Sequence, residues 1–134
     1  MILAPIVLDT NIVLDIFVFN DQVVQALRVE LEAGLRTWIA TDAMRAELAR
    51  VLGYPQIVPR LAVCELSAAD VLAAFDRLAH TVPAAVKAAM TCKDPDDQIF
   101  IDLAVAHRAR LLSKDGAVRA LRKRLAALGV AMEP

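Results

Sequence analysis

The sequence is poor in cysteine and histidine. Its 134 residues include two of each, and neither the cysteines (Cys64, Cys92) nor the histidines (His80, His107) lie at metal-binding spacing. Isolated residues of these types supply neither a disulfide framework nor a zinc site, and unpaired cysteines fit a reducing compartment. We therefore expect a cytoplasmic protein.

Aromatic residues and long apolar runs are also scarce. Aromatic residues make up only 4% of the chain although 58% is hydrophobic, so the core must be largely aliphatic. No apolar run is long enough to span a membrane, and Met1–Leu8 lacks the basic flank of a signal peptide. The apolar excess could leave surface for a partner, and we expect a homo-oligomer, with a dimer as the simplest form.

An excess of positive charge is absent as well. Fifteen Lys and Arg residues face 16 acidic residues, which gives a net charge of −1 and no overall attraction to nucleic acid. No linker, internal repeat or low-complexity tract divides the chain. We therefore expect one domain over residues 1–134.

The chain opens with a short apolar run that ends in a carboxylate. Residues 6–8 are Ile-Val-Leu, typical of a strand buried on both faces in a parallel sheet, and Asp9 follows them. In such sheets ligands bind beyond the carboxyl ends of the strands. Asp9 is either a functional acid at this edge or a residue that starts the next helix. Asn11 is the expected cap of that helix.

A second carboxylate lies on the apolar stripe of a helix. Residues 36–40 predict a strand, and Thr41 predicts the cap of a helix that continues to about Leu52. Glu47 shares that helix's buried face, where a carboxylate needs a partner or a cation. An ion pair with Arg50 is the alternative to a functional role.

A third acidic stretch begins another helix. After a capping-box helix over residues 67–80, the sequence reaches Asp94-Pro95-Asp96-Asp97. Asp94 as N-cap with Pro95 behind it is a strong helix start. Helix initiation explains Asp94 and Asp96 better than Asp97, which shares a face with apolar residues. The conformations of residues 55–66 and 81–92 stay open.

The last part of the chain repeats the arrangement of the first. Residues 110–113 predict a strand, Asp115 follows it, and a helix with Val118, Leu121, Leu125 and Leu128 on one face ends at Gly129 before a final strand over 130–132. Its opposite face is basic. Such a face is usually only solvated. The candidate nucleic-acid contacts are Lys93, Lys114 and Arg119.

Alternating strands and helices predict a three-layer α/β/α domain with a mostly parallel sheet of about five strands. Right-handed crossovers bring the carboxyl ends of the strands to one edge. Asp9 and Asp115 should meet there with Asp97, and Glu47 could complete the ring. Four carboxylates without Lys, His or Cys among them favour a hard cation, Mg²⁺ or Mn²⁺.

In order and spacing these motifs resemble the PIN-domain family of metal-dependent nucleases, which is common among toxins of prokaryotic toxin–antitoxin pairs. The resemblance covers essentially the whole chain. Val7-Leu8-Asp9-Thr10-Asn11 is similar to the first acidic motif, Glu47 to the helical glutamate, and 94–97 to the DPDD segment of a branch that contains toxin components. Ser113-Lys114-Asp115 is similar to the hydroxyl-x-acid motif, with Ser in place of the commoner Thr and Lys in place of a small residue.

The resemblance implies cleavage of single-stranded RNA with one or two Mg²⁺ or Mn²⁺ ions. It implies Asp9 and Asp97 as core ligands and catalytic residues, with Glu47 and Asp115 in supporting or water-mediated positions. Thr10, Asn11 and Ser113 would orient these acids, and Asp94 would be auxiliary. The toxin subtype implies a cognate antitoxin protein as partner.

Two other classes stay open. A Mg²⁺-dependent phosphoryl-transfer domain also uses strand-end aspartates, but the phosphatase pattern needs an acid at position 11, which is Asn, and a receiver domain has no role for Glu47. A non-catalytic PIN-like module that binds protein or RNA is the second alternative.

Overall fold

The computed structural model describes residues 4–133, so the first three residues and the last residue of the expected domain lie outside it. Its centre is a five-stranded sheet in the order β3-β2-β1-β4-β5, and every pair of neighbouring strands is parallel. The strands are β1 (Ile6–Leu8), β2 (Trp38–Ala40), β3 (Ala79–Thr81), β4 (Arg110–Leu112) and β5 (Met132–Glu133). The parallel α/β architecture predicted from the sequence is confirmed.

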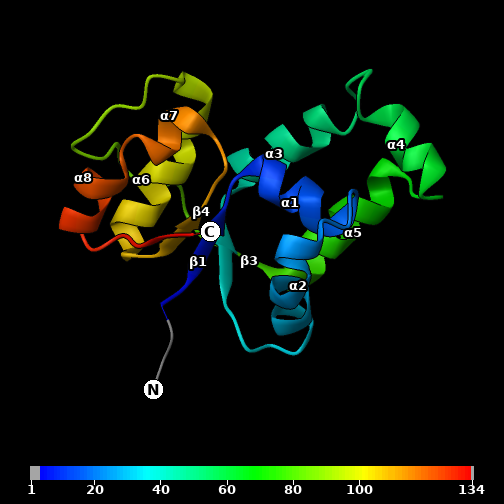
Figure 1. The fold of residues 1–134 in the computed structure, drawn as a ribbon, viewed down its shortest axis with the longest axis horizontal. Coiled ribbons are helices and arrows are strands. Elements are labelled where there is room, and N and C mark those ends of the chain that lie inside the picture. Colours follow the sequence, from blue (N-terminus) through cyan, green and yellow to red (C-terminus); the bar gives the residue numbers. More distant parts are fainter. Residues whose placement is uncertain (1–3, 134) are drawn as a thin grey trace.

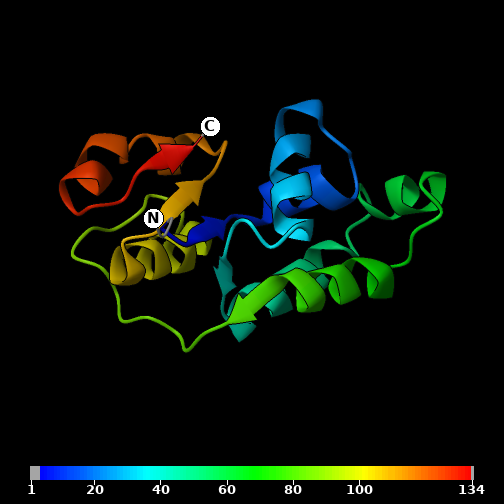
Figure 2. The ribbon, with the colours of Figure 1, turned by 90° about the horizontal axis from the view of Figure 1, so that it is seen from below.

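Within residues 4–133, eight α-helices and two short 3₁₀ helices connect the strands. They are α1 (Thr10–Phe17), η1 (Gln22–Val24), α2 (Gln25–Glu32), α3 (Asp42–Val51), α4 (Val58–Val63), α5 (Ala68–Leu78), η2 (Pro95–Asp97), α6 (Gln98–His107), α7 (Gly116–Arg119) and α8 (Arg122–Ala127). Helices α1–α5 lie on one side of the strands and α6–α8 on the other (Figures 1 and 2). Right-handed crossovers explain this division, because the chain moves outward from β1 through β2 to β3 and then in the opposite direction from β4 to β5.

The core is aliphatic around one aromatic group. Every residue of β1 is buried, as the unbroken apolar run predicts for a central parallel strand. Trp38 of β2 is stacked on Phe17 at 6.3 Å between ring centroids and meets Phe75 edge-on at 5.0 Å. These contacts attach α1 and α5 to the sheet.

Three of the predicted helix starts are confirmed and one is wrong. Thr41 caps α3, Ser67 and Asp70 form the capping box of α5, and Asp94 caps η2. Asn11 does not cap α1. Asp9 does so instead, because it has extended backbone angles and its carboxylate accepts a hydrogen bond from the Ile12 amide at 2.9 Å.

Two other elements differ from the prediction. The helix expected to end near His80 ends at Leu78, and the next three residues form β3, a partly exposed edge strand too short to show a strand pattern. The last helix is not continuous: it divides into α7 and α8, which leaves Leu128 38% exposed. None of the helices formed by residues 4–133 has the length and apolar character that crossing a bilayer requires.

Candidate metal centre

Asp9 and Asp115 lie at the carboxyl ends of neighbouring strands. β1 and β4 pair in register, with Leu8 opposite Leu112, so the residues that follow them emerge side by side. Each carboxylate also caps a helix: Asp115 Oδ1 accepts from the amides of Ala117 at 2.8 Å and Val118 at 3.3 Å. The two interpretations of Asp9 are therefore compatible, because capping uses one oxygen of the carboxylate, Oδ1, while its position at the sheet edge is kept.

Ser113 connects these two acids. It is fully buried, and its Oγ accepts a hydrogen bond from the Asp115 amide at 3.1 Å. Burial raises the pKa of Asp9, which is 3% exposed, whereas a hydrogen bond with Ser113 lowers it. The orienting role expected for Ser113 is thus consistent with its contacts.

Asp94 and Asp97 complete a compact acidic cluster. The tight turn of η2 separates them by three residues, and Asp94 Oδ1 fixes the turn by accepting from the Asp96 amide at 3.0 Å. One carboxylate oxygen from each of Asp94, Asp97 and Asp115 lies within 4.8 Å of the other two. Asp94, expected to be auxiliary, therefore belongs to this acidic triad.

Asp97 is the electrostatically strained member of the triad. The pKa of Asp97 is raised to about 7. The causes, from largest to smallest, are burial, the charge of Asp115, the charge of Asp94, a hydrogen bond with Asp115 and the charge of Asp9. Its Oδ2 is buried, and none of the residues that the structure describes donates a hydrogen bond to it. Asp97 Oδ2 is thus a buried acceptor surrounded by other carboxylates. Such an environment is better suited to binding a cation than to accepting a hydrogen bond from the protein.

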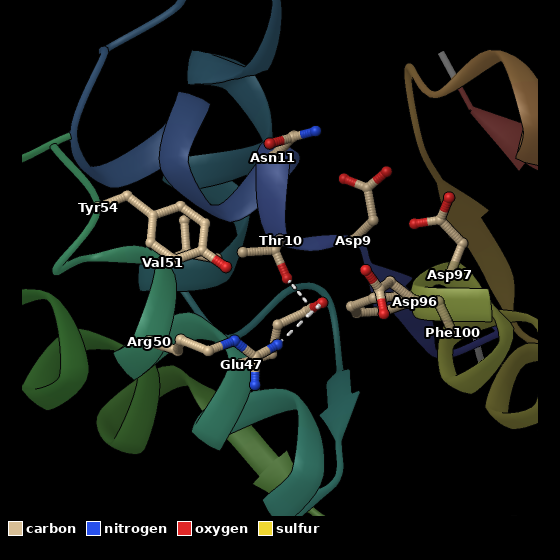
Figure 3. A pocket seen from close by; sticks show the side chains of 10 residues that line it. All are labelled: Asp9, Thr10, Asn11, Glu47, Arg50, Val51, Tyr54, Asp96, Asp97 and Phe100. Carbon is tan, nitrogen blue, oxygen red and sulfur yellow. Dashed lines mark hydrogen bonds and ion pairs between the residues drawn. The ribbon is translucent and has the colours of Figure 1, made fainter. Parts of the chain in front are cut away.

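Glu47 and Asp97 line the same cavity and lie on opposite walls of it. The cavity, about 170 Å³, is lined by Asp9, Thr10, Glu47 and Asp97 among others. Figure 3 shows Glu47 on one side and Asp97 on the other, with Asp9 and Thr10 between them. The Thr10 hydroxyl donates a hydrogen bond to Glu47, as an orienting residue should.

The ion pair proposed as an alternative for Glu47 also exists, but it is long. Arg50 Nη2 lies 3.9 Å from Glu47 Oε1, and the Arg50 side chain is 60% exposed. Such a pair is weak. Glu47 is therefore a cavity-lining acid with a loosely bound neighbour. Asn11 is exposed at the edge of the same cavity.

The three candidate nucleic-acid contacts differ in exposure and in their partners. Lys93 is exposed. Arg119 is partly buried, and its Nη1 donates to the Ser113 carbonyl at 3.2 Å. Lys114 Nζ lies 2.5 Å from Oδ2 of Asp15, a residue only 6% exposed. Lys114 thus forms an ion pair with Asp15 of α1.

Sequence reasoning missed residues that shape the site. Arg50, Tyr54 and Asp96 line the cavity, and Asp96 had been assigned only to helix initiation. Gln98 fixes the loop before Asp94: its Oε1 accepts from the Cys92 amide at 2.7 Å, and its Nε2 donates to the Met90 carbonyl at 3.0 Å. Only the spacing of Glu47 and Arg50, three residues apart on one face of α3, could have indicated the cavity wall in advance.

The donor set fits a hard divalent cation. The cluster offers carboxylate oxygens alone, which suits Mg²⁺ or Mn²⁺ and is unsuited to soft metals. The unsatisfied Oδ2 of Asp97 provides a position for such an ion. Asp94, Asp97 and Asp115 could hold it, with Asp9 and Glu47 nearby on the cavity wall.

The fold and the site define a class: a three-layer α/β/α domain with a parallel sheet and acidic side chains gathered beyond the carboxyl ends of its strands. Within that class, a family model described as PIN domain matches residues 5–115. The chain belongs to the PIN-domain family, whose members are generally metal-dependent nucleases. No curated protein matches the chain.

Proposed function

We propose that this protein is an endoribonuclease that hydrolyses phosphodiester bonds of single-stranded RNA with Mg²⁺ or Mn²⁺. The observation that carries the proposal is the Asp94–Asp97–Asp115 triad with its buried and unsatisfied Asp97 oxygen. Asp97 also lines a cavity together with Asp9 and Glu47. The membership of the PIN-domain family supports the same chemistry.

The residues divide into three roles. Asp97, Asp115 and Asp94 would hold the ion. Asp9, with Oδ1 fixed by the Ile12 amide, adds negative charge beside it. A bound divalent ion would lower the pKa of water and neutralise charge on the phosphate.

The opposite wall would align the substrate. Glu47 is oriented by Thr10 and can accept a proton or a hydrogen bond across the cavity. Ser113 sets the relative position of Asp9 and Asp115 through the contacts described above. Because these groups are fixed before substrate arrives, little reorganisation is needed during the reaction.

The biological role that we propose is that of the toxin in a toxin–antitoxin pair. The DPDD segment at 94–97 supports it. A cognate antitoxin and a second copy of the chain are the proposed protein partners. Val23, Val29 and Leu35, each at least 65% exposed near α2, supply apolar surface for one of them. Light scattering on the purified chain tests the dimer: a monomer at micromolar concentration would contradict it.

The function is tested by incubating the purified protein with a panel of single-stranded RNAs and Mn²⁺ or Mg²⁺. We expect cleavage that chelation by EDTA abolishes, and Asp97→Asn should reduce the rate by at least about a hundredfold while the fold is kept. Asp76→Asn is the matched control, because Asp76 pairs with Arg45 on the surface and does not line the cavity.

Four outcomes would contradict the proposal. Cleavage that persists in EDTA would exclude the metal role, and undiminished cleavage by Asp97→Asn would exclude the triad. Turnover of acetyl phosphate without RNA cleavage would favour a phosphoryl-transfer domain. If no RNA in the panel is cleaved and the protein still binds RNA or an antitoxin, the chain is a non-catalytic binding module.

A further inference from the structure

One wall of the cavity carries a cation and an aromatic ring in addition to a carboxylate. Glu47 and Arg50 belong to α3, and Tyr54 follows in the turn after the helix, where its amide donates to the Val51 carbonyl at 3.0 Å. Figure 3 shows the Arg50 and Tyr54 side chains facing the cavity on the side away from Asp96 and Asp97. This wall is therefore positioned beside the acidic cluster without being part of it.

Charge makes Arg50 distinctive. The cavity is lined by four acids, Asp9, Glu47, Asp96 and Asp97, and Arg50 is the one cationic residue among its described lining residues. RNA is a polyanion, so an acidic cavity repels it wherever no cation intervenes. If one substrate phosphate lies at the metal cluster, the neighbouring phosphate of the RNA can form a favourable ion pair with Arg50.

Arg50 is available for that contact. Its side chain is 60% exposed, and its distance of 3.9 Å from Glu47 is too long for a strong ion pair. A guanidinium has five donors in a planar fork and binds phosphate oxygens in pairs. A hydrogen bond with the Tyr54 side chain raises the pKa of Arg50 and holds its guanidinium beside the ring. The remaining donors of the guanidinium can bind a phosphate.

Tyr54 adds an aromatic surface next to this cation. It is the only tyrosine in the sequence, it is 37% exposed, and it lines the cavity. Exposed aromatic rings beside basic groups are the usual platform for unpaired bases, which stack on them regardless of sequence. Bases within a duplex already stack on one another and cannot use such a ring.

We propose that Arg50 and Tyr54 form a nucleotide subsite, in which Arg50 binds a phosphate adjacent to the cleaved bond and Tyr54 stacks on an unpaired base. This inference rests on the proposed function and deepens it, because it assigns the preference for single strands to one side chain. Positions 50 and 54 bind and select the substrate; the acids remain the catalytic residues.

Binding of fluorescent RNA, followed by anisotropy, tests the subsite. All variants are made in the full chain carrying Asp97→Asn, with Mn²⁺ present, so that bound RNA stays intact. The probes are one single-stranded oligonucleotide of mixed sequence and the duplex that it forms with its complement. Circular dichroism verifies that each variant is folded.

We expect Tyr54→Ala to weaken binding of the single strand by about tenfold, within the range that loss of one stacked base produces. Tyr54→Phe should keep the parent affinity because the ring remains, and neither change should alter duplex binding. Arg50→Met should weaken binding. It should also reduce the slope of log affinity against log salt concentration by about 1, as expected for the loss of one phosphate contact. Arg45→Met is the control, since Arg45 lies on the same helix but pairs with Asp76 at 2.7 Å outside the cavity.

The subsite is refuted if Tyr54→Ala and Arg50→Met bind the single strand with the parent's affinity and salt dependence, or if the parent itself does not bind it. The proposed function fails separately, when the wild-type chain with Mn²⁺ cleaves no single-stranded RNA. Wild-type cleavage combined with unaffected binding by both variants would leave the nuclease standing and remove only the subsite.

Discussion

Two carboxylates beside the turn between β4 and α7, one buried and one half-buried, have opposite electrostatic surroundings. The Asp15 side chain, 8% exposed, has the Lys114 ammonium 2.5 Å from its Oδ2. Asp97 is surrounded by the carboxylates of Asp94, Asp115 and Asp9, and burial together with their negative charges raises its pKa. The protein neutralises the first acid and leaves the second one uncompensated.

Lys114 shows that this difference is specific to the site. It lies in sequence between Ser113 and Asp115, both of which belong to the acidic edge. Successive residues of an extended segment point in opposite directions, so Ser113 and Asp115 face the cluster while Lys114 faces α1. The Lys114 ammonium group is thus directed away from the triad, and the negative charge that a divalent cation needs is kept.

The largest expected effect comes from removing one carboxylate from each region. Asp115→Asn takes a ligand from the triad and should weaken Mn²⁺ binding by about a hundredfold, whereas Asp15→Asn should leave it within about twofold. Calorimetric titration of the metal-free protein with Mn²⁺ measures both. Equal losses in the two variants would show that the Asp15 region takes part in metal binding and that the contrast is wrong.

The second effect concerns stability. Lys114→Met leaves the buried Asp15 carboxylate without its partner and should lower the free energy of unfolding by about 2 kcal/mol, less than for a fully buried pair because the Lys114 side chain is 50% exposed. Lys93→Met removes the same group from an exposed position and should change stability by under about 0.5 kcal/mol. Urea unfolding at pH 7 measures both.

A double variant sharpens this comparison. If the ion pair is the cause, Asp15→Asn together with Lys114→Met should cost less than the sum of the single changes. Additive costs would mean that Lys114 stabilises the turn through its packing and not through Asp15.

The sequence was informative where an element's pattern is local. The unbroken apolar run before Asp9, the hydroxyl at Thr41 and the Asp94-Pro95 pair each specify a strand end or a helix start without help from distant residues. Once parallel topology is inferred, the placement of Asp9 and Asp115 at one edge follows, and the structure puts them there.

The rest depended on contacts between distant segments. The side chain of Lys114 could reach Asp15 or the triad, and only the position of α1 decides between them. Asp94 enters the triad because η2 is a 3₁₀ turn, in which residues three apart are aligned. The strand at 79–81 has little pattern of its own, because it is a short edge strand that is defined by pairing with β2.

The smallest expected effect is the pH dependence of the uncompensated region. The pKa of Asp97 is raised to about 7 in the folded chain, against about 3.9 for an unfolded aspartate. The folded state therefore binds the Asp97 proton more tightly than the unfolded state does. This tighter binding stabilises the fold in full below about pH 4, and the stabilisation is lost as pH rises through about 7. Solvent screening limits the loss to about 1–2 kcal/mol, and burial of Asp9 acts in the same direction.

Urea unfolding in EDTA at pH 5 and pH 8 measures this loss. Asp97→Asn should remove most of it, whereas Asp76→Asn should not, because Arg45 lowers the pKa of Asp76 and its titration lies below this range. Saturating Mn²⁺ should reverse the trend, since the ion binds the ionised carboxylates and stabilises the folded chain more as pH rises. If Asp97→Asn keeps the wild-type dependence of the unfolding free energy on pH, the triad tolerates its charge without an ion. The proposed contrast between Asp97 and Asp15 would then be wrong.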